Sequence, residues 1–149
     1  MDRRKFLGLG LAAVAVVPAT LSATDFRTTK PATWTAHKVD EAAKALYGDV
    51  KLETSDDISI KVPKIASNGG AVPVGIKSDI KAKTVALFQD ANPEAAVAVW
   101  EVAEGTEIAY GLKIKMKGSG TVTVVVEGTD GKFYTASKAM QVALGGCEG

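Results

Sequence analysis

The stretch TVTVVVEGTDGKFYTAS, residues 121–137, decides the fold class of this 149-residue chain. Residues 121–127 are a run of valines and threonines, and residues 133–137 begin a second run with two aromatic residues; both compositions favour strands. Between them lies Gly128-Thr129-Asp130-Gly131, whose glycines and aspartate are common in tight turns. The pattern therefore predicts a β-hairpin.

Similar strand signals occur on both sides of this hairpin. Alternating or continuous apolar residues predict further strands near residues 58–62, 72–76, 85–88, 95–102, 112–116 and 139–144. Turn-forming residues separate them, as in Ser67-Asn68-Gly69-Gly70. About seven short strands with regular turns favour a mainly β protein, an immunoglobulin-like β-sandwich, although the cysteine pair of antibody domains is absent.

One short helix is expected before the strands. Val39, Ala42, Ala43 and Leu46 recur at helical spacing within residues 36–47, and Gly48 is a natural stop. Residues 24–35 are polar and are interpreted as a linker. The predicted domain therefore covers residues 36–144.

Residues 1–23 have the layout of an export signal. Arg3, Arg4 and Lys5 precede an apolar run over residues 6–17, and small residues surround possible cleavage points after Ala19 or Ala23. The run is shorter than the roughly 20 residues of a transmembrane helix. The arginine pair resembles the twin-arginine export signal, which predicts a periplasmic protein. A retained helix that lies on the membrane and tethers the domain is the alternative.

The charge of the chain argues against nucleic acid as a partner. Removing the leader takes Arg3, Arg4, Lys5 and Asp2 from 18 basic and 17 acidic residues, which leaves a net charge of −1. No basic run remains in the mature chain. Nucleic-acid-binding domains usually carry a basic patch or stripe, so this class is not expected.

The chain ends in GGCEG, residues 145–149, and Cys147 is its only cysteine. An unpaired thiol in an exported protein indicates intermolecular pairing or reactive chemistry, although an incidental surface thiol stays open. Gly145 and Gly146 carry no Cβ, so the segment is predicted to be a narrow, flexible arm. Three extended residues reach about 10 Å beyond the last strand.

No catalytic, metal-ligating or cofactor-binding residue is expected in the chain. A nucleophilic cysteine needs a base within hydrogen-bond reach, and the only histidine, His37, is interpreted as a solvated residue at a helix start. One cysteine and one histidine are too few for a zinc site. The carboxylates of Glu148 and the C-terminus disfavour the thiolate of Cys147. The thiol is therefore better suited as a handle on which other proteins act.

Four stretches of the sequence resemble the SoxY family, the sulfur-carrier subunits of the periplasmic thiosulfate-oxidising Sox system. VPKIASNGGAVPV, residues 62–74, is similar to a family segment, and Asn92-Pro93 follows a strand as in the family. Residues 130–142 resemble the family's final hairpin, and the GGCEG end is similar to its terminal GGCGG motif.

The resemblance implies an immunoglobulin-like sandwich that pairs with a second β-protein, SoxZ, and a cysteine, Cys147, that bears the substrate covalently. It also implies three partner enzymes: a c-type cytochrome that couples thiosulfate to the cysteine, a manganese-dependent hydrolase that releases sulfate, and in some pathways a sulfane dehydrogenase. The arm of Gly145, Gly146, Cys147, Glu148 and Gly149 would then enter partner active sites.

Glu148 departs from the family pattern, which has glycine at this position, and it adds bulk and charge beside the carrier sulfur. It leaves the set of partners open. Two other functions compete with the carrier hypothesis. An exported structural or adhesive β-sandwich subunit would give Cys147 no role, and a thiol enzyme would need a base that the sequence does not offer.

Overall fold

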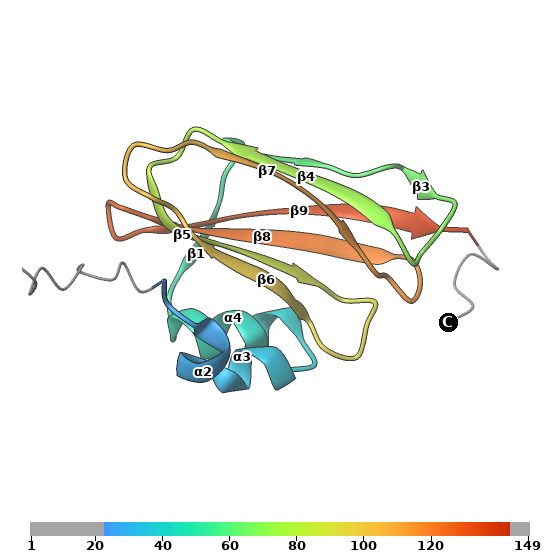
Figure 1. The fold of residues 1–149 in the computed structure, drawn as a ribbon, viewed down its shortest axis with the longest axis horizontal. Coiled ribbons are helices and arrows are strands. Elements are labelled where there is room, and N and C mark those ends of the chain that lie inside the picture. Colours follow the sequence, from blue (N-terminus) through green and yellow to red (C-terminus); the bar gives the residue numbers. More distant parts are fainter. Residues whose placement is uncertain (1–22, 144–149) are drawn as a thin grey trace, which may run out of the picture.

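The computed structural model describes residues 23–143 as a two-sheet sandwich with helices against one face (Figure 1). The larger sheet has the order β1-β9-β8-β5-β6, with β3 also paired to β9, and the smaller sheet has the order β2-β4-β7. The strands are β1 (Leu52–Thr54), β2 (Ile58–Lys61), β3 (Ile65–Ala66), β4 (Val72–Ser78), β5 (Ala82–Gln89), β6 (Ala96–Glu101), β7 (Ile108–Ile114), β8 (Gly120–Gly128) and β9 (Phe133–Val142). The prediction of a mainly β, immunoglobulin-like sandwich is confirmed.

The valine-rich strand β8 lies at the centre of the larger sheet, between β5 and β9. Val122, Val124 and Val126 face the smaller sheet and belong to the main core, whereas Val125 faces the helices and belongs to a second core. Because the sheet is covered on both faces, β8 is apolar on both faces over its central residues. Each buried valine contributes about 1.5–3 kcal/mol.

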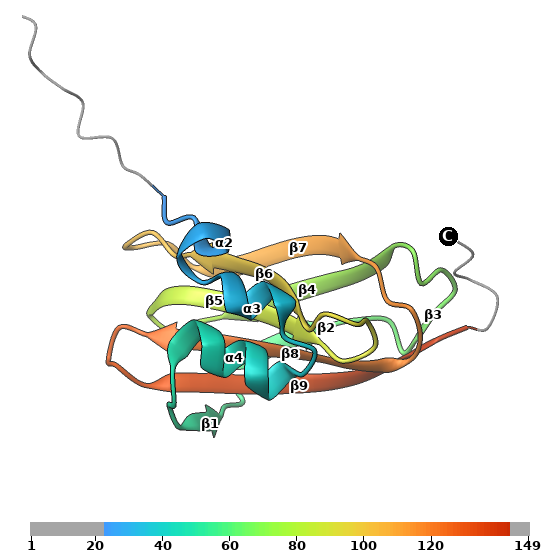
Figure 2. The same cartoon turned by 90° about the horizontal axis from the view of Figure 1, so that it is seen from below.

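Three helices, α2 (Phe26–Thr29), α3 (Pro31–Thr35) and α4 (Val39–Tyr47), form a third layer over the larger sheet (Figure 2). The expected helix over residues 36–47 is present from Val39, and Gly48 ends it with a positive φ of 81°. Ala42, Ala43 and Leu46 are buried against the sheet.

The linker interpretation of residues 24–35 needs correction, because α2 and α3 form there. The Asp25 side chain accepts hydrogen bonds from the Arg27 and Thr28 amides and caps α2, and Pro31 opens α3. The Trp34 indole donates to the Phe26 carbonyl at 3.1 Å and ties the two helices together. These contacts are local, but helices of four and five residues are too short to show a period.

The strand count also differs from the expected seven. Residues 133–137 and 139–144, expected as two strands, belong to the single strand β9, which ends at Val142. Strands β1 and β3 have only three and two residues, so they leave no alternation in the sequence. Both pair in parallel with the outer edge of β9 and cover it near its two ends.

Candidate functional site

The C-terminal end of β9 is the base from which the last residues of the chain depart, and it is held on both edges. The Ala143 amide donates to the Ala66 carbonyl of β3 at 2.9 Å. On the opposite edge the Val142 amide donates to Ser119 Oγ at 2.9 Å. The chain is therefore fixed until one residue after β9, and 59% of Ile65 is exposed beside this base.

Residues 62–74, which resemble the family segment, build the outer support of this base. The Asn68 side chain accepts the Gly70 amide at 2.9 Å, and its carbonyl accepts the Ala71 amide at 3.2 Å. The Gly69 carbonyl accepts the Met116 amide at 2.7 Å. This turn follows β3 directly, so the segment's polar residues hold the strand that pairs with β9.

Asn92 connects the larger sheet to the segment after β7. Its side chain donates to the Lys115 carbonyl at 2.7 Å and accepts the Lys117 amide at 2.8 Å. Its own amide donates to the fully buried Gln89 side chain at 2.7 Å. These hydrogen bonds of Asn92 fix the chain just before Ser119, whose hydroxyl accepts the Val142 amide. Sequence reasoning missed Ser119, because a serine in a glycine-rich turn carries no distinguishing signal.

The residues that the sequence predicts to carry function lie outside the described residues. This applies to the thiol, to the arm and to the arginine pair of the export signal: Cys147, Gly145, Gly146, Glu148, Gly149, Arg3 and Arg4. The structure thus describes only the C-terminal end of β9, from which the predicted arm would start.

His37 and Trp100 take different places in the structure. His37 is exposed just before α4, and its Nδ1 lies 2.7 Å from the Pro93 carbonyl, to which the ring donates. Trp100 is half-buried on the edge strand β6 and packs against the main core. The centroids of the Trp100 ring and of the Tyr110 ring on β7 are 4.9 Å apart, and the two ring planes make an angle of 32°. Trp100 therefore contributes to the core and also to the surface at the edge of the sheet.

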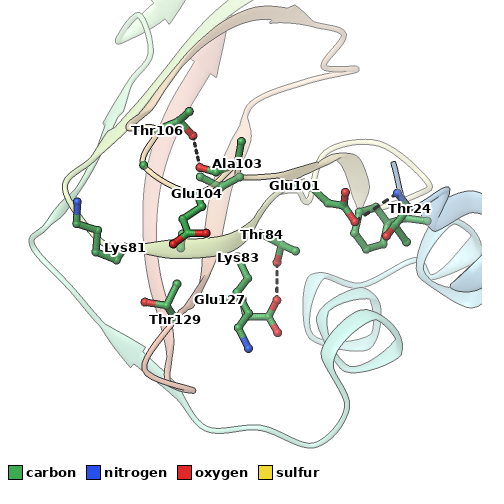
Figure 3. Close-up of a pocket in the computed structure, with 14 residues that line it drawn as sticks. Thr24, Lys81, Lys83, Thr84, Glu101, Ala103, Glu104, Thr106, Glu127 and Thr129 are labelled. Atoms are coloured by element: carbon green, nitrogen blue, oxygen red, sulfur yellow. Dashed lines mark hydrogen bonds between the residues drawn. The ribbon is translucent and has the colours of Figure 1, made fainter. Parts of the chain in front are cut away.

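A polar cavity of about 720 Å³ lies at the other end of the sandwich, beside the turn between β8 and β9 (Figure 3). Thr84, only 8% exposed, donates to Glu127 at 3.2 Å and accepts from the Tyr47 hydroxyl at 2.7 Å. Burial raises the pKa of Tyr47 well above its usual value, so this hydroxyl stays protonated. Glu101, which lines the same cavity, accepts a hydrogen bond from the Thr24 amide at 3.3 Å.

Among the described residues, the single histidine, His37, does not line this cavity. Nor do three or more His, Cys, Asp or Glu side chains gather into a metal site anywhere in residues 23–143. Over the same residues, every helix is too short or too polar to cross a membrane.

Known structures with a similar fold include the superoxide reductase (neelaredoxin) from Ignicoccus hospitalis. The two chains share 14% identity with a TM-score of 0.55, covering 62% of this chain and 95% of the reductase. At this identity the likeness shows the fold alone. No curated protein sequence matches the chain.

The sulfur carrier protein SoxY from Chlorobium limicola f thiosulfatophilum is more similar. It shares 32% identity with a TM-score of 0.66, covering 72% of this chain and 97% of the carrier. The sequence model of the family described as sulfur oxidation protein SoxY matches residues 43–147 and so includes Cys147. The chain therefore belongs to the SoxY family of sulfur oxidation proteins.

Proposed function

We propose that this chain is a covalent carrier that holds sulfur intermediates on Cys147 and presents them to partner enzymes. The family match that extends to Cys147 is the observation that carries the proposal. The base of β9 supports it, because Val142 and Ala143 are fixed by hydrogen bonds on both edges. Such a base holds the start of the C-terminal segment against the domain while the segment reaches a partner.

The chemistry needs only the sulfur atom of Cys147 from this chain. Thiosulfate couples to the thiol through a new S–S bond, which releases one proton and two electrons, and a c-type cytochrome accepts the electrons. A manganese-dependent hydrolase then adds water to the terminal sulfonate, so sulfate leaves and a persulfide remains on Cys147. In some pathways a sulfane dehydrogenase oxidises this remaining sulfur.

The proposal includes the compartment and a permanent partner. We expect residues 1–23, with Arg3 and Arg4, to direct export to the periplasm by the twin-arginine route. We also expect a SoxZ-like β-subunit to form a heterodimer with the chain. The half-exposed side of the sandwich, where Trp100 and Tyr110 meet, is one face that such a subunit could cover.

Intact-mass spectrometry of the chain, isolated from its own cells supplied with thiosulfate, tests the proposal. We expect mass additions of a thiosulfonate and of extra sulfur atoms, located to Cys147 and removed by reductant. The matched control is Cys147→Ser, which should carry neither. An unmodified Cys147 in wild-type protein from cells that are oxidising thiosulfate would contradict the carrier function and favour a structural subunit.

Valine at both glycines before the thiol tests how the arm is used. Gly145→Val with Gly146→Val lies beyond the last strand, so folding should be unchanged. Loading by partner enzymes should be slower, because β-branched residues thicken and stiffen the segment. Spontaneous alkylation of Cys147 by a small reagent is the control and should change little. Equal loading rates for the variant and wild type would contradict an arm that threads into narrow sites.

A further inference from the structure

The outer face of the smaller sheet contains a shallow trough, defined here as Lys61, Gly75, Lys77, Gly111 and Lys113. Strand register places Lys61, Gly75 and Gly111 side by side across β2, β4 and β7. The neighbouring rows place Lys77 beside Ala109 and Lys113 beside Pro73. Lysines therefore lie in the glycine row and in the rows on both sides of it, about 7 Å apart along the strands.

The backbone does not require glycine at either position. Neither Gly75 nor Gly111 has a positive φ, and the pairing of β4 with β7 continues without a bulge. A Cβ on Gly111 would meet no atom within 4 Å, and one on Gly75 would make ordinary contact with the Lys61 Cβ at 3.4 Å. Glycine weakens a strand interior, and without a bulge or bend it marks a place where another chain approaches closely.

The trough has an apolar floor. A groove of about 600 Å³ extends from the two glycines to Pro63 and Pro73. A second groove, of about 420 Å³, shares Lys61, Gly75 and Gly111 with the first and extends along the sheet to Lys77. Together they form a continuous surface that could accept several residues of an extended segment.

The charge of this surface is one-sided. Three lysines surround the two glycines, and no aspartate or glutamate lines either groove. The whole chain has 18 basic and 17 acidic residues, so the excess is local. The side chains of these three lysines are exposed. Carboxylates of another protein would complement them.

We propose that the trough is a docking surface for an acidic, extended segment of a partner protein. The segment's main chain lies over Gly75 and Gly111, and its carboxylates meet Lys61, Lys77 and Lys113. A second copy of this chain fits poorly, because it would bring the same lysines against each other. The apolar floor distinguishes the surface from a simple anion site, since it also takes up side chains.

The trough lies near the base of the C-terminal segment. Pro63 lines the groove, and the next residue, Lys64, accepts the Gln141 amide of β9 at 3.0 Å. A partner docked here lies beside the point where β9 ends. This position would bring a partner enzyme close to Cys147, and that benefit rests on the proposed carrier function. The docking of the acidic segment does not depend on that function.

Zero-length carbodiimide cross-linking, which joins lysine amines to carboxylates, tests the docking. The full-length tagged chain is cross-linked in its own cells and the linked peptides are sequenced by mass spectrometry. We expect links from Lys61, Lys77 and Lys113 to aspartates or glutamates of another protein. Links from exposed control lysines, Lys44 and Lys132, should be rare.

Four outcomes would overturn the proposal. These are links concentrated on the control lysines, links to this chain's own Glu148, links to a second copy, and no links at all. The same experiment with Cys147→Ser separates the two proposals. If the links are unchanged in this variant, the docking surface is supported. If Cys147 of the wild-type protein also never carries sulfur in the mass measurement, the carrier function alone is contradicted.

Gly111→Val distinguishes a surface reserved for a partner from a structural glycine. The new side chain meets no atom of this chain and valine favours strands, so the urea midpoint should stay equal or rise. Cross-links from the three trough lysines should fall about tenfold, because the side chain fills the trough. Ala139→Val, on the exposed face of β9, is the matched control and should leave the links unchanged. Lower stability, or unchanged links, would contradict the proposal.

Discussion

The two ends of β9 are secured in different ways. At its start, the Tyr134 hydroxyl donates to Asp130 at 2.6 Å, and the same carboxylate accepts the Lys132 amide at 2.9 Å. These partners lie within four residues of one another. At its end, Ala66 and Ser119 hold Ala143 and Val142, and they lie 77 and 23 residues away in the chain.

The start of β9 is therefore stabilised by contacts between residues close in sequence, and its end by contacts between residues far apart in sequence. The turn contacts at the start of β9 form once the hairpin forms, and they need no other part of the fold. The contacts at its end require β3 and the turn before β8 to be already in place. The functional part of a carrier would thus depart from the end that relies on the whole domain.

The largest expected effects come from the glycines at the two ends of β8. A Cβ on Gly128 would meet Asp130 and lie 3.1 Å from the Tyr134 ring, and one on Gly120 would lie 2.5 Å from the Asp90 carboxylate. Gly128→Ala and Gly120→Ala should each lower the free energy of unfolding by on the order of 1–3 kcal/mol, because the neighbours must shift. Urea titration measures this.

Gly111→Ala is the matched control for both changes, since its Cβ would meet no atom within 4 Å. This change should leave the free energy of unfolding the same. Alanine at Gly120 or Gly128 that is as well tolerated as at Gly111 would show that the close approaches at the strand ends do not matter.

Ser119→Ala should have a smaller and local effect at the end of β9. It removes the acceptor of the Val142 amide, a bond worth about 1 kcal/mol or less at an exposed site. Hydrogen exchange at Val142 and Ala143 should become faster, while amides at the start of β9 should not change. Faster exchange at Tyr134 as well would mean that the two ends are coupled and not independent.

The pair of Tyr134 and Asp130 predicts a weak pH dependence at the start of β9. The hydrogen bond to Asp130 raises the pKa of Tyr134 to about 12, and the same bond holds the pKa of Asp130 below its usual value. A lowered carboxyl pKa adds stability that is lost as pH falls below about 4. A raised tyrosine pKa adds stability that is lost as pH rises between about 10 and 12.

Tyr134→Phe should abolish the change at high pH and weaken the change at low pH, because the Lys132 amide still lowers the pKa of Asp130. The measurement is urea unfolding against pH for this variant and wild type, compared as a difference so that other titrating groups cancel. Because Asp130 is exposed and Tyr134 is only partly buried, solvent should keep the difference small. A difference that does not vary with pH would contradict a pKa coupling between these two groups.

The smallest effect is expected beyond the end of β9, at Glu148. Its charge acts on Cys147 with a Coulomb energy of about 1 kcal/mol or less in a solvated chain. Glu148→Gly should therefore speed alkylation of Cys147 only slightly, and added salt should abolish the difference. Loading by partner enzymes could change more, because there Glu148 must enter a shaped site. Equal small changes in both rates would mean that Glu148 does not select partners.

The sequence by itself determined the elements whose signals are local. The valines of β8 and the glycine–aspartate turn after it predicted the hairpin, and Gly48 predicted the end of α4. The terminal Cys147 with its glycines, and residues 62–74, indicate the SoxY family from the sequence alone. These features are readable because period, turn chemistry and motif each lie within a few consecutive residues.

Only the tertiary structure decided how the base of the C-terminal segment is held and where a partner could dock. The two residues of β3 form a strand only because β9 is beside them, and Ser119 matters only because Val142 reaches it. The trough likewise needs Lys61, Gly75 and Gly111 to meet from three strands. Such pairings follow from strand register across the sheet, and register depends on contacts that no local stretch of sequence contains.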